Sequence, residues 1–141
     1  MARALLDTGA IVALINRSDR HHPAAVDWFQ RFRGQLLTTE AVITETAYVL
    51  AGSLSHQRAA LLWFERARRA KLLQVEPVAD YAALARIIAQ YANMPCDYAD
   101  ASLIALAQHT GVTAIATVDQ RDFSVYRLRR RRRFRILLGL S

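Results

Sequence analysis

The stretch that decides the fold of this chain reads MPCDYADASLIALA over residues 94–107. Asp97 stands where a helix N-cap stands, and Asp100 follows in the first turn. Asp100 also shares one helix face with the apolar residues at i+3, i+4 and i+7, which are Leu103, Ile104 and Ala107. A carboxylate on the core face of a helix needs a partner, because burying an unpaired ionised carboxylate is costly.

Both acids also have a purely structural interpretation. Asp97 can cap the helix by accepting a hydrogen bond from an early backbone N–H, and Asp100 can complement the positive end of the helix dipole. This interpretation suits Asp97 well. It suits Asp100 less well, because a partner of the dipole has no need to point toward the core. The question is whether other acids are placed in the same way.

Strands and helices alternate on both sides of this stretch. Short apolar runs predict buried strands at residues 2–6, 36–38, 72–75 and 112–118. Amphipathic spacing and capping residues predict helices at residues 10–15, 23–32, 40–50, 57–70, 80–92 and 98–109. The alternation predicts an α/β fold with a mostly parallel central sheet of about four to five strands flanked by helices. We expect residues 1–141 to form a single domain.

The C-terminal segment, about residues 124–141, has a different composition. It predicts a basic hairpin or tail, with short strands at residues 124–126 and 134–138 and an arginine run at residues 129–133 between them. Two interpretations of this run remain open. It is either a solvated loop or a contact to phosphate groups.

Three further acids occupy positions like that of Asp100. Asp7 directly follows the strand predicted at residues 2–6, and Asp119 directly follows the strand predicted at residues 112–118. Ligands of open parallel sheets bind at these carboxyl ends. Glu45 lies at helical spacing from apolar residues, namely Ala41, Val42 and Val49. Asp7, Glu45, Asp100 and Asp119 would repel one another if they met without a cation. Mg²⁺ and Mn²⁺ take such oxygen ligands, so the four acids predict a divalent-metal site.

The charge of the chain indicates what such a site acts on. The formal net charge is +7, and all but one of the 19 basic residues are arginine. This favours a polyanionic partner, with nucleic acid ahead of a membrane surface. Metal-bound carboxylates on a basic protein predict hydrolysis of phosphodiester bonds. Thr8 and Thr117 flank two of the acids, and two interpretations remain open: they hydrogen-bond waters on the metal, or they are an ordinary cap and an ordinary strand residue.

Other features of the sequence limit the alternatives. Cys96 is the only cysteine, so no internal disulfide forms and a reducing, cytoplasmic location is expected. The first residues fit neither a signal peptide nor a membrane span. Gly9 occupies the place where an aspartyl-phosphate phosphatase carries its general acid, and no phosphate-binding Gly-Lys loop or Gly-x-Ser-x-Gly elbow is present. His21 and His22 lack the spacing of zinc ligands.

Four segments together resemble the PIN-domain ribonucleases, and most of all the VapC toxins of prokaryotic VapBC toxin–antitoxin modules. They read LLDTGA at residues 5–10, VITE at 42–45, DYADASLI at 97–104 and ATVDQRDF at 116–123, and the resemblance extends over residues 5–126. It implies a PIN-like fold in which four acids bind Mg²⁺ or Mn²⁺ and carry the catalysis: Asp7, Glu45, Asp100 and Asp119. Asp97 and Asp122 match positions that are acidic less regularly, and they are secondary candidates.

The resemblance also implies a substrate and partners. Proteins of this kind are endoribonucleases that cut single-stranded RNA, often within structured RNA such as tRNA. They form homodimers and are neutralised by a small VapB-like antitoxin whose C-terminal segment lies over the acidic groove. The arginine-dense residues 127–135 depart from the pattern of the family. The alternatives are a housekeeping RNA-processing PIN nuclease and a non-catalytic protein that binds nucleic acid or a protein partner.

Overall fold

The computed structural model describes residues 2–78 and 80–139. Strands and helices alternate along the chain, as predicted. In order, the elements are β1 (Ala2–Leu6), α1 (Thr8–Ile15), α2 (His22–Arg31), β2 (Gly34–Thr39), α3 (Glu40–Val49), α4 (Leu54–Arg69), β3 (Leu73–Glu76), α5 (Tyr81–Gln90), α6 (Tyr98–Thr110), β4 (Ala114–Ala116), α7 (Gln120–Val125), the 3-10 turn η1 (Arg129–Arg131) and β5 (Arg135–Ile136).

The five strands form one sheet in the order β3-β2-β1-β4-β5, and every neighbouring pair is parallel. The prediction of an α/β fold with a parallel sheet of four to five strands is therefore confirmed. β1 lies at the centre, where Leu5 pairs with Leu37 of β2 and with Ile115 of β4. The strand order reverses between β1 and β4, and a crevice at the carboxyl ends of strands forms at such a switch point.

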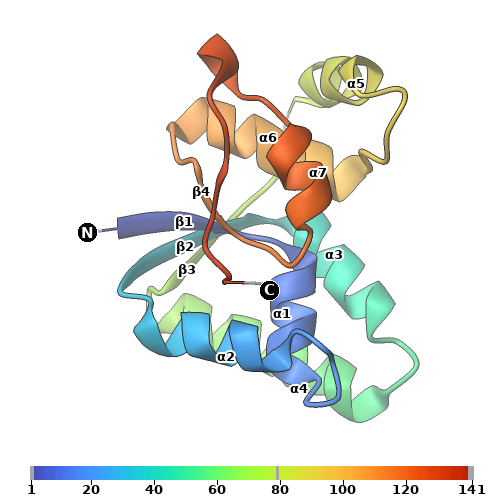
Figure 1. Cartoon of the computed structure of the whole chain (residues 1–141). Coiled ribbons are helices and arrows are strands. Elements are labelled where there is room, and N and C mark those ends of the chain that lie inside the picture. The colour runs from blue at the N-terminus through green and yellow to red at the C-terminus, as the bar shows by residue number, and fades with distance from the viewer. Residues whose placement is uncertain (1, 79, 140–141) are drawn as a thin grey trace.

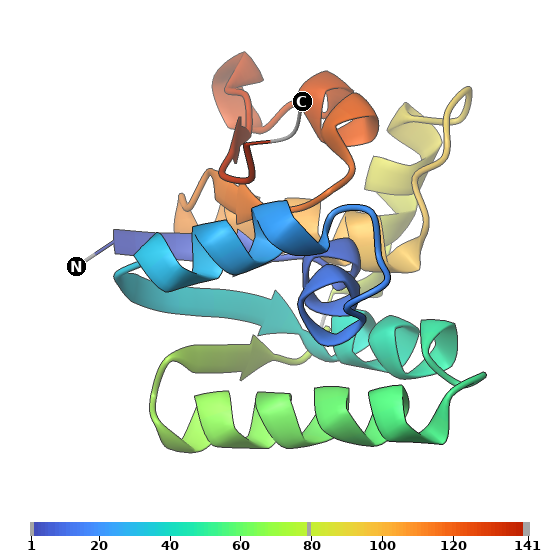
Figure 2. The same ribbon diagram turned by 60° about the horizontal axis from the view of Figure 1, so that its bottom comes forward.

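Helices cover both faces of the sheet (Figures 1 and 2). Because successive side chains of a strand point to opposite faces, each half of the core takes alternate residues of β1. Leu6 packs with the buried residues of α1, α2 and α4, whereas Leu5 packs with those of α3, α5, α6 and α7. No helix within the described residues has the length and apolar character that crossing a membrane requires.

The predicted C-terminal hairpin is wrong. Asp119 accepts a hydrogen bond from the backbone N–H of Asp122 at 3.0 Å and thereby starts α7, which takes in residues that were predicted to be a strand. Phe123 and Tyr126 are both fully buried, at the i, i+3 spacing of a helix face. The second predicted strand is reduced to β5, which lies parallel beside β4. Only an isolated antiparallel bridge between Arg127 and Arg133 remains of the hairpin.

Gly9, in the first turn of α1, has no room for a side chain. A Cβ atom at Gly9 would overlap the Cγ2 methyl of Val118, a β-branched residue with little freedom to move away. We expect Gly9→Ala to lower the free energy of unfolding by about 1–3 kcal/mol, as overpacking does. Urea unfolding followed by circular dichroism measures this.

Gly52→Ala is the matched control, because nothing lies within 4 Å of a Cβ at that position. It should leave the stability unchanged or raise it slightly. The double variant Gly9→Ala with Val118→Ala should recover part of the loss. Equal stability of the Gly9→Ala protein and the parent would show that α1 does not approach Val118 this closely.

Candidate active site

Asp7 is a buried carboxylate at the carboxyl end of the central strand. Its side chain is 6% exposed. Oδ1 accepts a hydrogen bond from the backbone N–H of Thr8 at 2.8 Å, and Oδ2 accepts one from the hydroxyl of Thr117 at 2.7 Å. Burial raises the pKa of Asp7 to about 6, although these hydrogen bonds work in the opposite direction. The effect of burial on this pKa is thus larger than that of the two hydrogen bonds, so the ionised form of Asp7 is disfavoured.

Two threonines connect Asp7 to the acids beside it. The hydroxyl of Thr8 donates to Oε2 of Glu45 at 3.1 Å. The hydroxyl of Thr117, which donates to Asp7, also accepts a hydrogen bond from the backbone N–H of Asp119 at 3.0 Å. The sequence left open hydrogen bonding to metal-bound waters or an ordinary cap and strand residue for these threonines. The structure shows a different role, in which both hydroxyls donate directly to the acids.

Glu45 on α3 and Asp100 on α6 lie near Asp7, where the strand order predicts a crevice at the switch point of the sheet. Burial raises the pKa of Glu45, and the negative charge of Asp97 adds to this effect. Burial also raises the pKa of Asp100, to about 8, with further contributions from the charges of Asp97, Asp7 and Glu45. The charges of Glu45 and Asp119 in turn raise the pKa of Asp7. The four acids selected from the sequence therefore lie close enough to act on one another electrostatically.

Asp97 and Asp122 border this group, and both take part in helix starts. Asp97 caps α6 by accepting a hydrogen bond from the N–H of Asp100 at 2.8 Å, while Oδ2 of Asp100 accepts one from the N–H of Asp97 at 3.3 Å. The capping interpretation thus holds for Asp97, and Asp100 combines a capping role with its place in the crevice. Asp122 lies in the first turn of α7, where burial and the charge of Asp119 raise its pKa.

Tyr126 contacts the site, and sequence analysis missed it. Its hydroxyl donates to the carbonyl oxygen of Pro95 at 2.6 Å and lies 3.3 Å from Oδ2 of Asp100. The residue was assigned to a strand, so nothing placed its ring near α6. The apolar pair of Phe123 and Tyr126 at helical spacing is the one signal that pointed to a helix here.

The described acids around Asp7 do not form a ready-made set of metal ligands. Within residues 2–78 and 80–139, no three acidic, histidine or cysteine side chains converge into a set arranged to hold a metal ion. Asp7, Glu45 and Asp100 each accept from local donors instead. Their donor set consists of carboxylate oxygens, which suit a hard cation such as Mg²⁺ or Mn²⁺ better than zinc.

The raised pKa of Asp100 makes the stability of the metal-free protein depend on pH. The folded state binds a proton more tightly than the unfolded chain between the ordinary pKa of 3.8 and the folded pKa of about 8. This stabilisation is fully present below pH 3.8 and is lost as the pH rises to about 8. We expect the free energy of unfolding of the parent to fall by about 1–2 kcal/mol more than that of Asp100→Asn between about pH 5 and pH 8.

Chemical denaturation in EDTA at a series of pH values measures this difference. The amide of Asp100→Asn retains an acceptor for the N–H of Asp97 but carries no titrating proton, so its stability should vary less over this interval. Parallel pH profiles for the two proteins would contradict the electrostatic description of Asp100.

Thr117 provides a second test of how the acids are held. Thr117→Val keeps the shape of the buried side chain but removes the donor to Asp7 and the acceptor for the N–H of Asp119. We expect a loss of about 1–3 kcal/mol in the free energy of unfolding, because buried groups lose their partners. Thr117→Ser keeps the hydroxyl and should lose less. Thermal unfolding of both variants decides the point, and equal losses would mean that only packing matters there.

Comparisons with known proteins identify the family and the fold of this chain. A sequence model of the PIN domain matches residues 4–128. Ribonuclease VapC26 of Mycobacterium tuberculosis (strain ATCC 25618 / H37Rv) is 26% identical over 123 residues, which make up 87% of this chain and 91% of that protein. The crystal structure of Mycobacterium tuberculosis VapC20, a Sarcin-Ricin loop cleaving toxin, matches with a TM-score of 0.72 at 21% identity, over 85% of this chain and 92% of that chain.

The structural match shows that the fold is shared, and the match to the domain model shows the family. The matched residues contain all four segments on which the resemblance was based, from the strand before Asp7 to the helix after Asp119. The prediction of the family from those segments is confirmed: this chain belongs to the PIN-domain family.

Proposed function

We propose that this chain is a divalent-metal-dependent endoribonuclease, the toxin of a toxin–antitoxin pair, that acts on tRNA or another structured RNA. One observation carries the proposal: Asp7, Glu45, Asp100 and Asp119 lie near one another beside the switch point of the sheet, where burial and mutual repulsion raise the pKa of Asp7 and of Asp100. The names of VapC26, a ribonuclease, and of VapC20, a Sarcin-Ricin loop cleaving toxin, support the same activity.

The chemistry of the crevice fits a hard divalent cation. Acids with a raised pKa give up their protons readily once a cation lies between them, because it replaces repulsion with attraction. We propose that Asp7, Glu45, Asp100 and Asp119 hold Mg²⁺ or Mn²⁺, with Asp97 and Asp122 in secondary positions. When bound, such an ion supplies a water of lowered pKa and neutralises charge on the phosphate.

Hydrogen bonds from neighbouring residues orient the carboxylates of this site. Thr117 and the N–H of Thr8 hold the two oxygens of Asp7, while the hydroxyl of Thr8 holds Glu45. Asp100 is oriented from the other side by the N–H of Asp97 and by the hydroxyl of Tyr126. Fixing these carboxylates before substrate binds lowers the cost of organising the site during the reaction.

A protein partner is supported by an exposed apolar groove between the end of α1 and α4. Leu54 is 78% exposed and Leu62 is 37% exposed, and both line this groove together with Ile15 and Trp63. Apolar surface of this kind in an otherwise charged protein is typical of protein interfaces. We propose that the partners are a small VapB-like antitoxin and a second copy of this chain, in the cytoplasm.

Cleavage of labelled total RNA by the purified, antitoxin-free protein tests the proposal. Reactions contain Mg²⁺, Mn²⁺ or EDTA. We expect metal-dependent cleavage that falls at least about 100-fold in Asp7→Asn and in Asp100→Asn, because each removes a charge from the site. Circular dichroism should show that both variants remain folded.

Asp27→Asn is the matched control, since Asp27 forms an exposed ion pair with Arg31 on α2 at 3.1 Å. It should cleave as the parent does. Undiminished cleavage by Asp100→Asn would place the active site elsewhere. A folded, metal-loaded parent that cuts no RNA would favour the non-catalytic binding protein instead.

A further inference from the structure

Residues 127–135, here called the arginine loop, contain seven arginines, five of them consecutive. We infer that the arginine loop is a second RNA-binding surface, which grips phosphates of a structured RNA far from the bond that is cut. The choice of RNA as the ligand rests on the proposed function. The binding surface itself rests on how the loop is anchored, on its free charges and on its position.

The loop is fixed to the body of the protein at both ends. Leu128 and Phe134 are each only 7% exposed and pack into the core beneath α6 and α7. Between them, the N–H of Leu128 donates to the carbonyl oxygen of Arg132 at 2.8 Å, and Arg127 pairs with Arg133 across an antiparallel bridge. A loop clamped in this way presents its tip in a defined shape, so less ordering is needed when a ligand binds.

Arg127 belongs to this framework and not to the binding tip. Its guanidinium donates to the carbonyl oxygens of Ser124, Val125 and Tyr126 at 2.6, 2.8 and 3.0 Å. These are backbone acceptors at the C-terminal end of α7, where a cation is favourable. The five exposed arginines of residues 129–133 are therefore the candidates for ligand contact.

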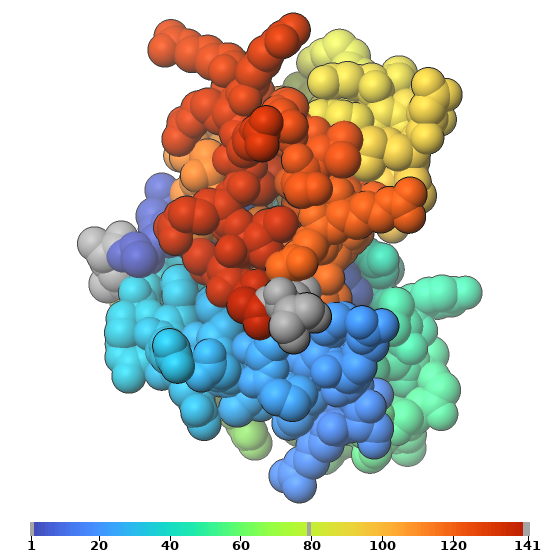
Figure 3. Space-filling model, in the orientation of Figure 1, coloured from blue at the N-terminus to red at the C-terminus, as the bar shows by residue number. Residues whose placement is uncertain are grey.

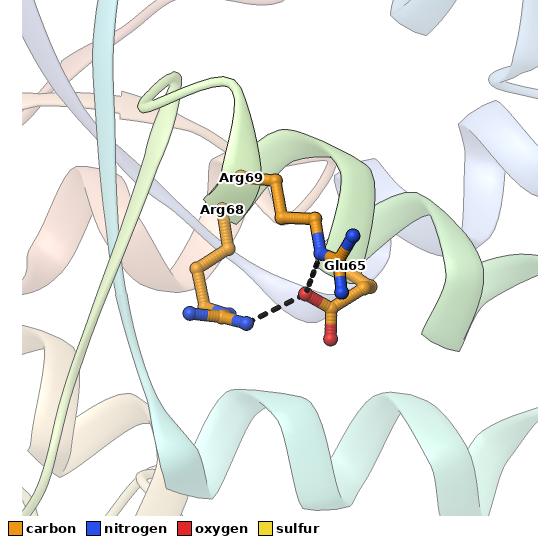
Figure 4. A network of polar contacts seen from close by, with 3 residues as sticks. All are labelled: Glu65, Arg68 and Arg69. Carbon is orange, nitrogen blue, oxygen red and sulfur yellow. Dashed lines mark hydrogen bonds and ion pairs between the residues drawn. The ribbon is translucent and has the colours of Figure 1, made fainter.

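These five guanidinium groups have no acidic partner in the described part of the chain. The ion pairs found there join Arg31 to Asp27, and Arg68 and Arg69 to Glu65 at 2.6 and 3.2 Å (Figure 4). None involves residues 129–133. Five adjacent like charges repel one another, and a polyanion is the ligand that offsets this repulsion.

The backbone of the tip is strained. Arg130 and Arg131 both have a φ of 60°, in the left-handed region that residues other than glycine rarely adopt. Strain of this kind persists where the surrounding structure imposes it, and it is common at ligand-binding positions. Long side chains of this segment project from the surface at the top of Figure 3. The tip therefore spreads its charges into solvent instead of folding them back.

The acidic crevice cannot hold RNA by its own side chains alone. Within the described residues, the ion pairs join arginines only to Asp27 and Glu65, so Asp7, Glu45 and Asp100 have no arginine or lysine partner. A carboxylate cluster repels phosphates. Affinity for RNA has to come largely from positive charge elsewhere, because phosphate contacts dominate nucleic-acid binding.

The loop lies at the end of α6 opposite Asp100. Arg129, Arg130 and Arg132 line a hollow of about 230 Å³ together with residues around the C-terminal end of that helix, including Gly111. At about 1.5 Å per residue, Asp100 and Gly111 are about 16 Å apart along α6. An RNA that touches both ends of α6 must therefore extend at least that far from the bond that is cut.

Arginine chemistry favours RNA over the other polyanionic partners. The planar guanidinium fork binds phosphate oxygens in pairs and is the preferred group for nucleic-acid recognition. A loop that inserts into a lipid interface needs apolar side chains, and residues 129–133 offer none, so any attraction of this loop to a membrane would be electrostatic alone. The apolar residues of the loop, Leu128 and Phe134, point into the core instead.

RNA binding in EDTA, where no metal-dependent cleavage occurs, tests the inference. The probe is a fluorescent RNA hairpin with a stem of about ten base pairs, longer than the ~16 Å between the two ends of α6. In the test variant, Arg129, Arg130, Arg131, Arg132 and Arg133 are all replaced by Gln. We expect at least a tenfold weaker Kd by fluorescence anisotropy, and a salt dependence reduced by about 0.9 in log–log slope for each lost phosphate contact.

The matched control removes the same charge elsewhere, by Gln at five exposed arginines: Arg3, Arg17, Arg20, Arg58 and Arg66. It should weaken binding much less. A second variant with Lys at residues 129–133 keeps the charge but loses the fork, and it should bind with intermediate affinity. Equal losses in the loop variant and the control would reduce the effect to bulk charge and overturn the inference, as would unchanged binding.

Two further arms separate the possible outcomes. With Mg²⁺, the loop variant should raise KM for the long hairpin and leave kcat unchanged, while cleavage of an RNA dinucleotide, whose single phosphodiester group is the bond that is cut, stays as in the parent. If the parent cuts no RNA but the loop-dependent binding remains, the proposed nuclease function fails and the binding surface stands. Loss of binding to phosphatidylserine vesicles with undiminished RNA binding would assign the loop to a membrane.

Discussion

The structure depends on one buried carboxylate and its two donors. Asp7 follows the last residue of β1, and its own N–H donates to the carbonyl oxygen of Ala116 at 3.0 Å, which continues the pairing of β1 with β4. Its oxygens are held by the N–H of Thr8 and the hydroxyl of Thr117, so β1, α1 and β4 meet at this side chain. The contact of Gly9 with Val118 follows from the same constraint, because α1 has to begin at once beside the end of β4.

Three helix starts surround this point. Asp7, Asp97 and Asp119 are the N-caps of α1, α6 and α7, so the positive ends of these helices face the acids of the crevice. N-terminal dipoles and backbone donors favour ionised carboxylates. Even so, the pKa of Asp7 rises to about 6 and that of Asp100 to about 8, because burial and mutual repulsion outweigh them. The helix N-termini reduce the cost of burying these carboxylates, but they do not make the ionised forms of Asp7 and Asp100 the favoured ones.

The sequence predicted the features that depend on local patterns and missed those that depend on long-range contacts. The four acids were found because each breaks a local pattern, as an acid at a strand end or on a core face of a helix, and such patterns are visible without tertiary contacts. Tyr126 and the pairing of β5 were missed because both depend on long-range contacts. The hydroxyl of Tyr126 bonds to Pro95, 31 residues away, and the two residues of β5 are too short a run to show a period. Asp119 has the side chain of a helix N-cap and could have predicted α7, but a strand was predicted at residues 124–126 instead.

The two ends of α6 share a physical character. At its start, clustered acids are held together against repulsion and burial, and beyond its end, five unpaired arginines are held on a strained turn. Each arrangement is unfavourable alone, and each becomes favourable with a ligand of the opposite charge, a cation in one case and a polyanion in the other. A phosphodiester chain with its metal ion satisfies both at once. If the proposed function holds, an RNA long enough to reach both ends of α6 binds more tightly than a short one, so length affects how well a substrate is bound.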